Sequence, residues 1–64
     1  MEDFEMRLIK EHEELSDKID KLKNFMKTKI FKELDKEQIK LLNDQLFHMI
    51  RYNLILVDRI KLIK

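Results

Sequence analysis

The chain contains no glycine and no proline in its 64 residues, and this absence restricts the fold more than any other feature of the sequence. Tight turns between strands commonly use a glycine with positive φ or a proline with fixed φ. Helices need neither residue in their interior. The sequence therefore predicts an all-α protein with long helices and few corners.

Apolar residues recur at alternating spacings of four and three in both halves of the chain, which is the spacing of a coiled-coil seam. The first seam consists of Leu8, His12, Leu15, Ile19, Leu22 and Met26. The second seam consists of Ile39, Leu42, Leu46, Met49, Asn53, Leu56, Ile60 and Ile63. Each seam needs a covering partner, so we expect two helices, at about residues 3–29 and 36–62, that pack against each other.

A corner at residues 30–35 joins the two expected helices. Asp35 is a good N-cap residue, and Gln38 three positions later completes the pattern of a capping box. Such a short corner forces the helices to run antiparallel. The sequence therefore predicts one domain over residues 1–64, an antiparallel two-helix hairpin of the coiled-coil type.

The corner also sets the register between the seams, because facing positions then have residue numbers that sum to about 65. Ile19 faces Leu46 in this register, and His12 faces Asn53, so the two polar residues of the seams form a pair. A polar seam residue often fixes register at a cost in stability, and we expect that role here. A polar pocket that binds a ligand is the alternative.

The second helix carries more apolar surface than one partner helix can cover. Nine of the twelve residues from Leu46 to Val57 are apolar or aromatic. Beside the seam lies a second apolar row, which consists of Phe47, Ile50, Leu54 and Val57. An exposed row of this kind usually marks an interface, and a chain this short is marginal alone. We expect a homo-oligomer, either a dimer or a higher helical bundle; the alternative is that the row docks onto a host protein.

Several classes of function are not expected from the composition. The chain has no cysteine, which removes disulfides and thiolate metal sites. It shows no secretory signal pattern, and no uncharged run approaches the roughly 18 residues of a membrane span, so we expect a cytoplasmic protein. We expect no catalysis, metal or cofactor, because phosphate-binding loops, nucleophile–base pairs and Glu-x-x-His pairs are missing. Double-stranded nucleic acid is not an expected partner either, since the lysines are interleaved with acids and no helix-turn-helix is present.

The charges are sorted along the chain, although the formal net charge is only +1. Residues 1–17 carry a net charge of −5, residues 18–40 carry +4, and residues 41–64 carry +2. An acidic start and a basic end complement the dipole of a helix. The acidic side chains at the start can also mimic nucleic-acid phosphates toward a basic host enzyme; they are Glu2, Asp3, Glu5, Glu11, Glu13 and Glu14.

Polar and aromatic residues of the second helix form a candidate ligand site. Gln45, Tyr52 and Arg59 are spaced by seven and form one column along the helix. An arginine fork and a tyrosine ring, here Arg51 and Tyr52, suit a phosphate and a purine. If a ligand binds, we expect these residues and Lys61 to line clefts between protomers. The simpler interpretation is that Tyr52 packs at an interface and Arg51 pairs with an acid.

Residues 8–62 resemble a family of very small phage proteins first catalogued from a crAss-like phage. The shared residues are Leu15, Ile19, Leu22, Phe25, Phe31, Leu34, Gln38, Leu41, Leu42, Gln45, Leu46, Met49, Tyr52, Ile55, Leu56, Arg59 and Ile60. The chain is also distantly similar to anti-CBASS helical hairpins, phage sponges that hold cyclic nucleotide signals of bacterial immunity between protomers.

This resemblance implies a phage accessory protein that acts in the host cytoplasm and counters host defence by binding, with a cyclic nucleotide as the sequestered signal. Two other functions remain open. One is a protein-binding inhibitor of a host defence enzyme, of the anti-CRISPR kind. The other is a purely structural coiled coil that takes part in assembly.

Overall fold

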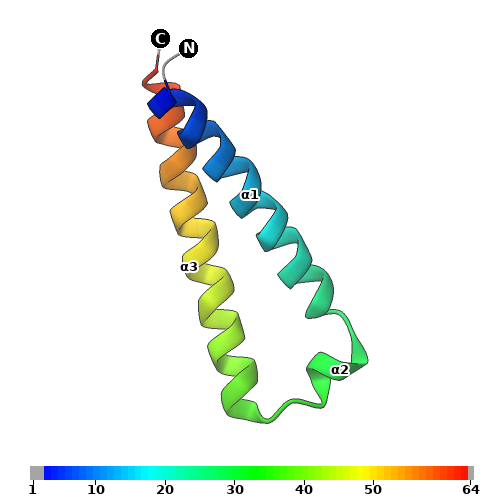
Figure 1. Ribbon diagram of the computed structural model, residues 1–64. Coiled ribbons are helices and arrows are strands. Elements are labelled where there is room, and N and C mark those ends of the chain that lie inside the picture. The colour runs from blue at the N-terminus through cyan, green and yellow to red at the C-terminus, as the bar shows by residue number, and fades with distance from the viewer. Residues whose placement is uncertain (1–2, 64) are drawn as a thin grey trace.

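The structure, a computed structural model, describes residues 3–63, so Met1, Glu2 and Lys64 lie outside it. The described residues form three helices and no strand: α1 (Asp3–Phe25), α2 (Lys29–Lys32) and α3 (Lys36–Lys61). The long helices α1 and α3 are antiparallel and pack against each other, with α2 between them in the chain (Figure 1). The predicted all-α helical hairpin is confirmed. Within residues 3–63, no helix is both long enough and apolar enough to cross a membrane.

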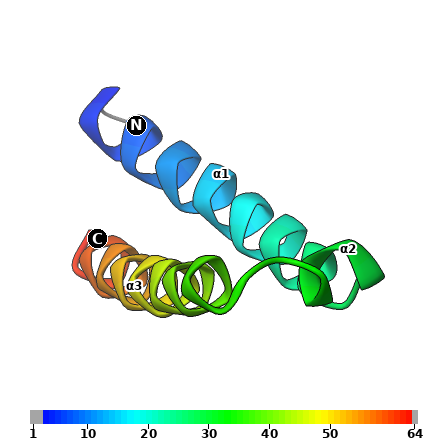
Figure 2. The same cartoon turned by 90° about the horizontal axis from the view of Figure 1, so that it is seen from below.

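The hairpin is long and narrow, with extents of 46 × 15 × 13 Å. The beginning of α1 and the end of α3 lie at one end of it, which we call the open end, and α2 lies at the other end, the corner (Figure 1). The two long helices are inclined to each other, because they separate toward the corner in Figure 1 and toward the open end in Figure 2. The helices therefore cross, and the surface that they share is limited.

The core lies where the two seams meet. Its buried members come from both long helices; they are Leu8, Leu15, Ile19 and Leu56. Leu56 is the most enclosed of them, with 0% of its surface exposed. Partly buried side chains pack around this cluster, namely Leu46, Met49, Ile50, Ile60 and Ile63. All of these residues except Ile50 belong to the seams that the spacing predicts.

α3 begins at Lys36 because Asp35 caps it. The backbone of Asp35 is extended, with φ −69° and ψ 163°, and its side-chain Oδ1 accepts a hydrogen bond from the backbone N–H of Gln38 at 2.9 Å. This bond satisfies one of the N–H groups that the first turn of a helix leaves without a partner. The start of the second long helix is therefore where the sequence places it.

The first long helix ends earlier than the sequence suggests, at Phe25 instead of about residue 29. The reason is Thr28, whose backbone is extended with φ −85° and ψ 160°. Its hydroxyl donates to the backbone oxygen of Phe25 at 2.6 Å and accepts from the backbone N–H of Phe31 at 3.3 Å. Thr28 thus satisfies a terminal carbonyl of α1 and caps α2, a one-turn helix that the sequence interpretation treats as plain corner.

Candidate functional site

A shallow depression of about 200 Å³ lies at the open end, on the side of α3 that carries Arg59. α1 contributes most of its lining, and the residues are Phe4, Arg7, Leu8, Glu11 and Arg59. The spacings within α1 are three and four residues, which place these side chains along one side of that helix. The depression therefore depends on the packing of α1 against the last turns of α3.

Arg59 and Phe4 form the clearest contact in this depression. The guanidinium carbon of Arg59 lies 5.8 Å from the centroid of the Phe4 ring, a cation–π geometry. The Phe4 side chain is still 58% exposed, so much of its apolar surface faces solvent. An aromatic surface of this kind is suited to stacking against a nucleobase.

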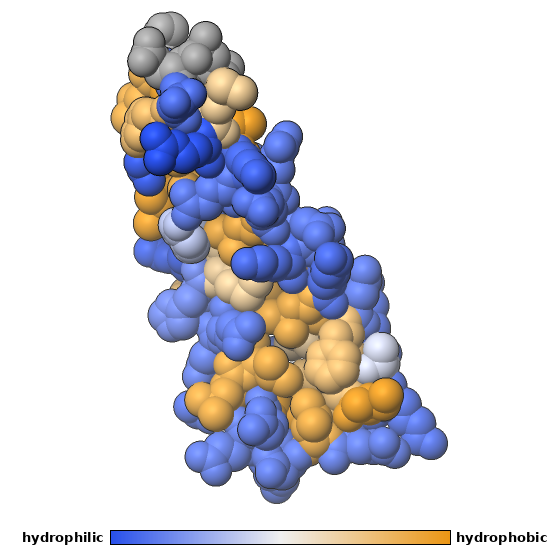
Figure 3. Space-filling view, in the orientation of Figure 1, coloured by the Kyte–Doolittle hydropathy of each residue, from blue (hydrophilic) through white to orange (hydrophobic). Residues whose placement is uncertain are grey.

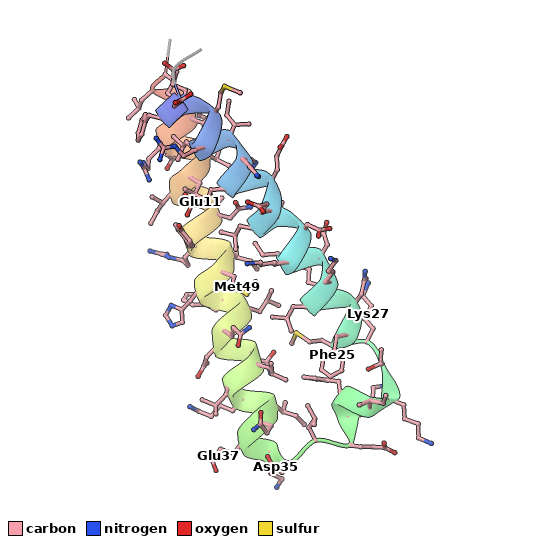
Figure 4. All side chains as sticks on the ribbon, viewed as in Figure 1. Glu11, Phe25, Lys27, Asp35, Glu37 and Met49 are labelled. Carbon is pink, nitrogen blue, oxygen red and sulfur yellow. The ribbon has the colours of Figure 1, made fainter. Side chains whose placement is uncertain are left out.

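The electrostatic character of the depression comes from two guanidinium groups and one carboxylate. Arg7 and Arg59 each offer a planar fork of donors that fits phosphate or carboxylate oxygens, and Glu11 offsets one of their charges. Figure 4 shows Glu11 near the open end, with Met49 and Phe25 further along the hairpin toward the corner. The depression therefore combines a net positive charge with an exposed aromatic ring.

The structure brings together only part of the ligand site that the sequence suggests. Gln45, Tyr52 and Arg59 occupy one side of α3, because seven residues make nearly two full turns. Gln45 Nε2 lies 3.9 Å from Met49 Sδ, and the Tyr52 side chain is 44% exposed. The column thus presents an amide, a phenol and a guanidinium along one side of the hairpin.

Arg51 and Lys61 point elsewhere. The Arg51 guanidinium carbon lies 5.9 Å from the centroid of the Phe47 ring, so Arg51 packs on the second apolar row. Lys61 follows Arg59 by two residues, which turns its side chain by about 200° around the helix. The structure does not place either residue in the depression that contains Arg59.

Phe4 and Arg7 are absent from the site that the sequence suggests. The register gives a partial signal, since the numbers of Phe4 and Arg59 sum to 63, close to the value of about 65 for facing seam positions, so both residues lie near the open end. The register alone does not single out Arg59, because the numbers of Phe4 and Lys61 sum to 65.

His12 and Asn53 face each other within the seam and are both half-buried. His12 Nδ1 lies 2.8 Å from Asn53 Oδ1, and Asn53 Nδ2 donates to Ser16 Oγ at 3.0 Å. Because Oδ1 can only accept, the Nδ1 atom of His12 carries the proton in this arrangement. The Asn53 amide therefore bonds to two residues of α1 and fixes the register between α1 and α3.

The second apolar row flanks a different depression, of about 260 Å³, on the other side of the hairpin. Both long helices line it, through Ser16, Ile19, Asp20 and Lys23 of α1 and Ile50, Asn53, Leu54 and Val57 of α3. Phe47 and Leu54 are each 58% exposed, whereas Ile50 and Val57 are half-buried. Further apolar surface lies toward the corner on the face seen in Figure 3.

The fold and these two depressions define a small helical-hairpin protein with exposed apolar and cationic surface on α3. A family model described as Sequestin matches residues 2–62, and the chain belongs to the Sequestin family. The description suggests that members act by sequestering something that they bind, in agreement with the sequestering function implied by the resemblance. Comparisons with curated proteins and with solved structures found no match.

Proposed function

We propose that the protein sequesters a cyclic nucleotide signal and thereby counters host defence during phage infection. It acts by binding, with no chemical step. Two observations support the proposal: the family description suggests sequestration, and the open-end depression pairs guanidinium groups with an aromatic ring.

The contact between Arg59 and Phe4 carries this proposal. A cyclic nucleotide presents a phosphodiester with negative oxygens and a flat base close to it. Arg7 and Arg59 suit the phosphate through charge-assisted hydrogen bonds, and the exposed Phe4 ring suits the base through stacking. Tyr52, on the same side of α3 as Arg59, adds a second aromatic surface along the column.

The depression at the open end is too small to hold a whole nucleotide, so a second protomer is part of the proposed site. Pockets for small ligands commonly measure about 300–1,000 Å³, so a depression of about 200 Å³ holds only part of a nucleotide. Exposed apolar side chains flank Arg59: Ile55 of α3 is 56% exposed, and Leu62, which directly follows α3, is 82% exposed. A second chain that packs on these residues encloses the rest of the ligand.

Native mass spectrometry tests this function. The protein is purified from cells with and without an active cyclic-nucleotide defence system, and its mass is measured under native conditions. We expect extra mass of nucleotide size on an oligomer in the first sample alone. The purified protein is also titrated calorimetrically with cyclic AMP, cyclic di-AMP, cyclic di-GMP and cyclic GMP–AMP.

Unliganded protein in both samples, together with no heat of binding for any of the four nucleotides, would overturn the proposal. A host protein that co-purifies in stoichiometric amount would instead point to an inhibitor of a defence enzyme. The acidic side chains from Asp3 onward would then be the first surface to change, by replacement with glutamine.

A further inference from the structure

The second apolar row extends at both ends into polar residues of α3. The complete row reads Asn43, Phe47, Ile50, Leu54, Val57 and Lys61, with spacings of four, three, four, three and four. It lies across α3 from the column that contains Arg59, and it flanks the 260 Å³ depression. The row is therefore a separate surface from the proposed nucleotide site.

The row has a palindromic pattern about its centre. The residue numbers of Asn43 and Lys61 have the same sum as those of Phe47 and Val57, and of Ile50 and Leu54. If two copies of α3 lie antiparallel along this row, every apolar member faces an apolar member of the other copy. A surface that matches its own reversed copy is what a two-fold symmetric contact requires.

The hairpin exposes more surface than is expected for a compact protein of its mass. The chain exposes 5463 Å². A compact protein of 8.0 kDa is expected to expose about 4,450 Å². The excess of roughly 1,000 Å² is similar to the 800 Å² or so that each partner contributes to a standard interface.

We infer that the row binds a second copy of this chain, in an antiparallel pair with a two-fold axis between residues 50 and 54. Phe47 packs against the partner's Val57, and Ile50 packs against the partner's Leu54. A parallel pair along the same row would instead set each residue against its own copy, so the two Lys61 ammonium groups would lie together and repel each other.

The polar ends of the row also match in the antiparallel pair. Asn43 Nδ2 donates to the backbone oxygen of Ile39 at 3.0 Å, which leaves Asn43 Oδ1 free to accept. The register sets the partner's Lys61 opposite Asn43, and an ammonium group donates to such an oxygen. The apolar contact between the two rows is therefore flanked at each end by a hydrogen bond between Asn43 and Lys61 of different copies.

Disulfide cross-linking tests the pair and its orientation, because the chain has no cysteine of its own. The variants Phe47→Cys and Val57→Cys are prepared separately, mixed without nucleotide, and oxidised. We expect a covalent dimer of twice the 8.0 kDa chain mass in the mixture, with residue 47 joined to residue 57. Each variant alone should give at least tenfold less dimer.

Two further substitutions test whether the cross-link depends on the second apolar row. Each is introduced into both cysteine variants before they are mixed. Leu54→Glu should abolish the cross-link, whereas Leu41→Glu should leave it unchanged, because Leu41 has nearly the same exposure and points about 140° away. Circular dichroism confirms that both variants are helical. Efficient dimerisation of Phe47→Cys alone, or equal yields for Leu54→Glu and Leu41→Glu, would overturn the inference. Nucleotide binding does not enter this test, so its result is independent of the proposed function.

Discussion

His12 Nδ1 lies 2.8 Å from Asn53 Oδ1, and this bond joins the middle of α1 to α3 across the seam. The residues are separated by 41 positions in the chain, so the bond is a tertiary contact that exists only when the hairpin is closed. A seam of leucine and isoleucine alone would tolerate a shift of one helix along the other. The amide of Asn53 opposes such a shift, because its two hydrogen bonds fit one register.

Truncating Asn53 to alanine should lower stability, because the cost of a polar seam residue is relative to a leucine that fills the same space. Asn53→Ala deletes the bonds to His12 and Ser16, each worth about 1 kcal/mol. For a chain of this size, each kcal/mol lowers Tm by roughly 4–8 °C. Thermal unfolding followed by circular dichroism measures the change. Asn24→Ala, an exposed position of α1, is the matched control and should leave Tm nearly unchanged or slightly raised. Equal Tm values for the two variants would show that the amide contributes nothing.

Thr28 should matter through its hydroxyl group. Thr28→Ala removes the cap of α2 and the bond to Phe25, at a cost of about 1 kcal/mol. Thr28→Ser keeps the hydroxyl and should retain most of the stability. Urea denaturation of both variants gives the difference in unfolding free energy. A serine variant as unstable as the alanine variant would contradict the capping role.

Leu56 should be the apolar position most sensitive to truncation. Its side chain is 0% exposed, and Leu56→Ala leaves a cavity that costs about 2–5 kcal/mol. The neighbouring Ile55 is 56% exposed, so Ile55→Ala should cost much less. Circular dichroism at 25 °C, with urea titration, compares the two. A similar loss of stability in both variants would mean that burial in the hairpin does not determine the effect.

Arg59 should determine nucleotide retention. Arg59→Ala removes a charged donor worth about 1.5–3 kcal/mol, which corresponds to roughly a tenfold to hundredfold rise in Kd. Arg51→Ala removes the same charge from a side chain that packs on Phe47, and it should leave Kd nearly unchanged. Calorimetric titration with whichever of the four cyclic nucleotides binds gives both values. If Arg51→Ala weakens binding as much as Arg59→Ala, the site lies elsewhere on α3.

The architecture was predictable because it depends on local patterns that extend over many turns. The seam spacing specifies two long helices, and the capping residue Asp35 specifies where the second begins. The end of α1 was not predictable in the same way. The apolar spacing gives no stop signal near Thr28, but the Thr28 hydroxyl bonds to the backbone of Phe25 and Phe31 and so ends α1.

The candidate ligand site was less predictable, because it combines residues from opposite ends of the sequence. The column of Gln45, Tyr52 and Arg59 follows from spacing within one helix. The depression also needs Phe4 and Arg7, which approach Arg59 only through the packing of α1 on α3. Arg51 and Tyr52 suit a phosphate and a purine by their chemistry, but neighbours in a helix point about 100° apart, and Arg51 lies over the Phe47 ring.

The placement of α2 has a practical consequence for attaching probes. The start of α1 and the end of α3 lie at the open end, so a purification tag or a dye at either position sits close to the Phe4–Arg59 depression (Figure 1). The corner is at the opposite end of a molecule 46 Å long. A fluorophore or surface linker on the exposed Lys29 or Lys32 of α2 would report tumbling, capture and assembly while leaving the depression unobstructed.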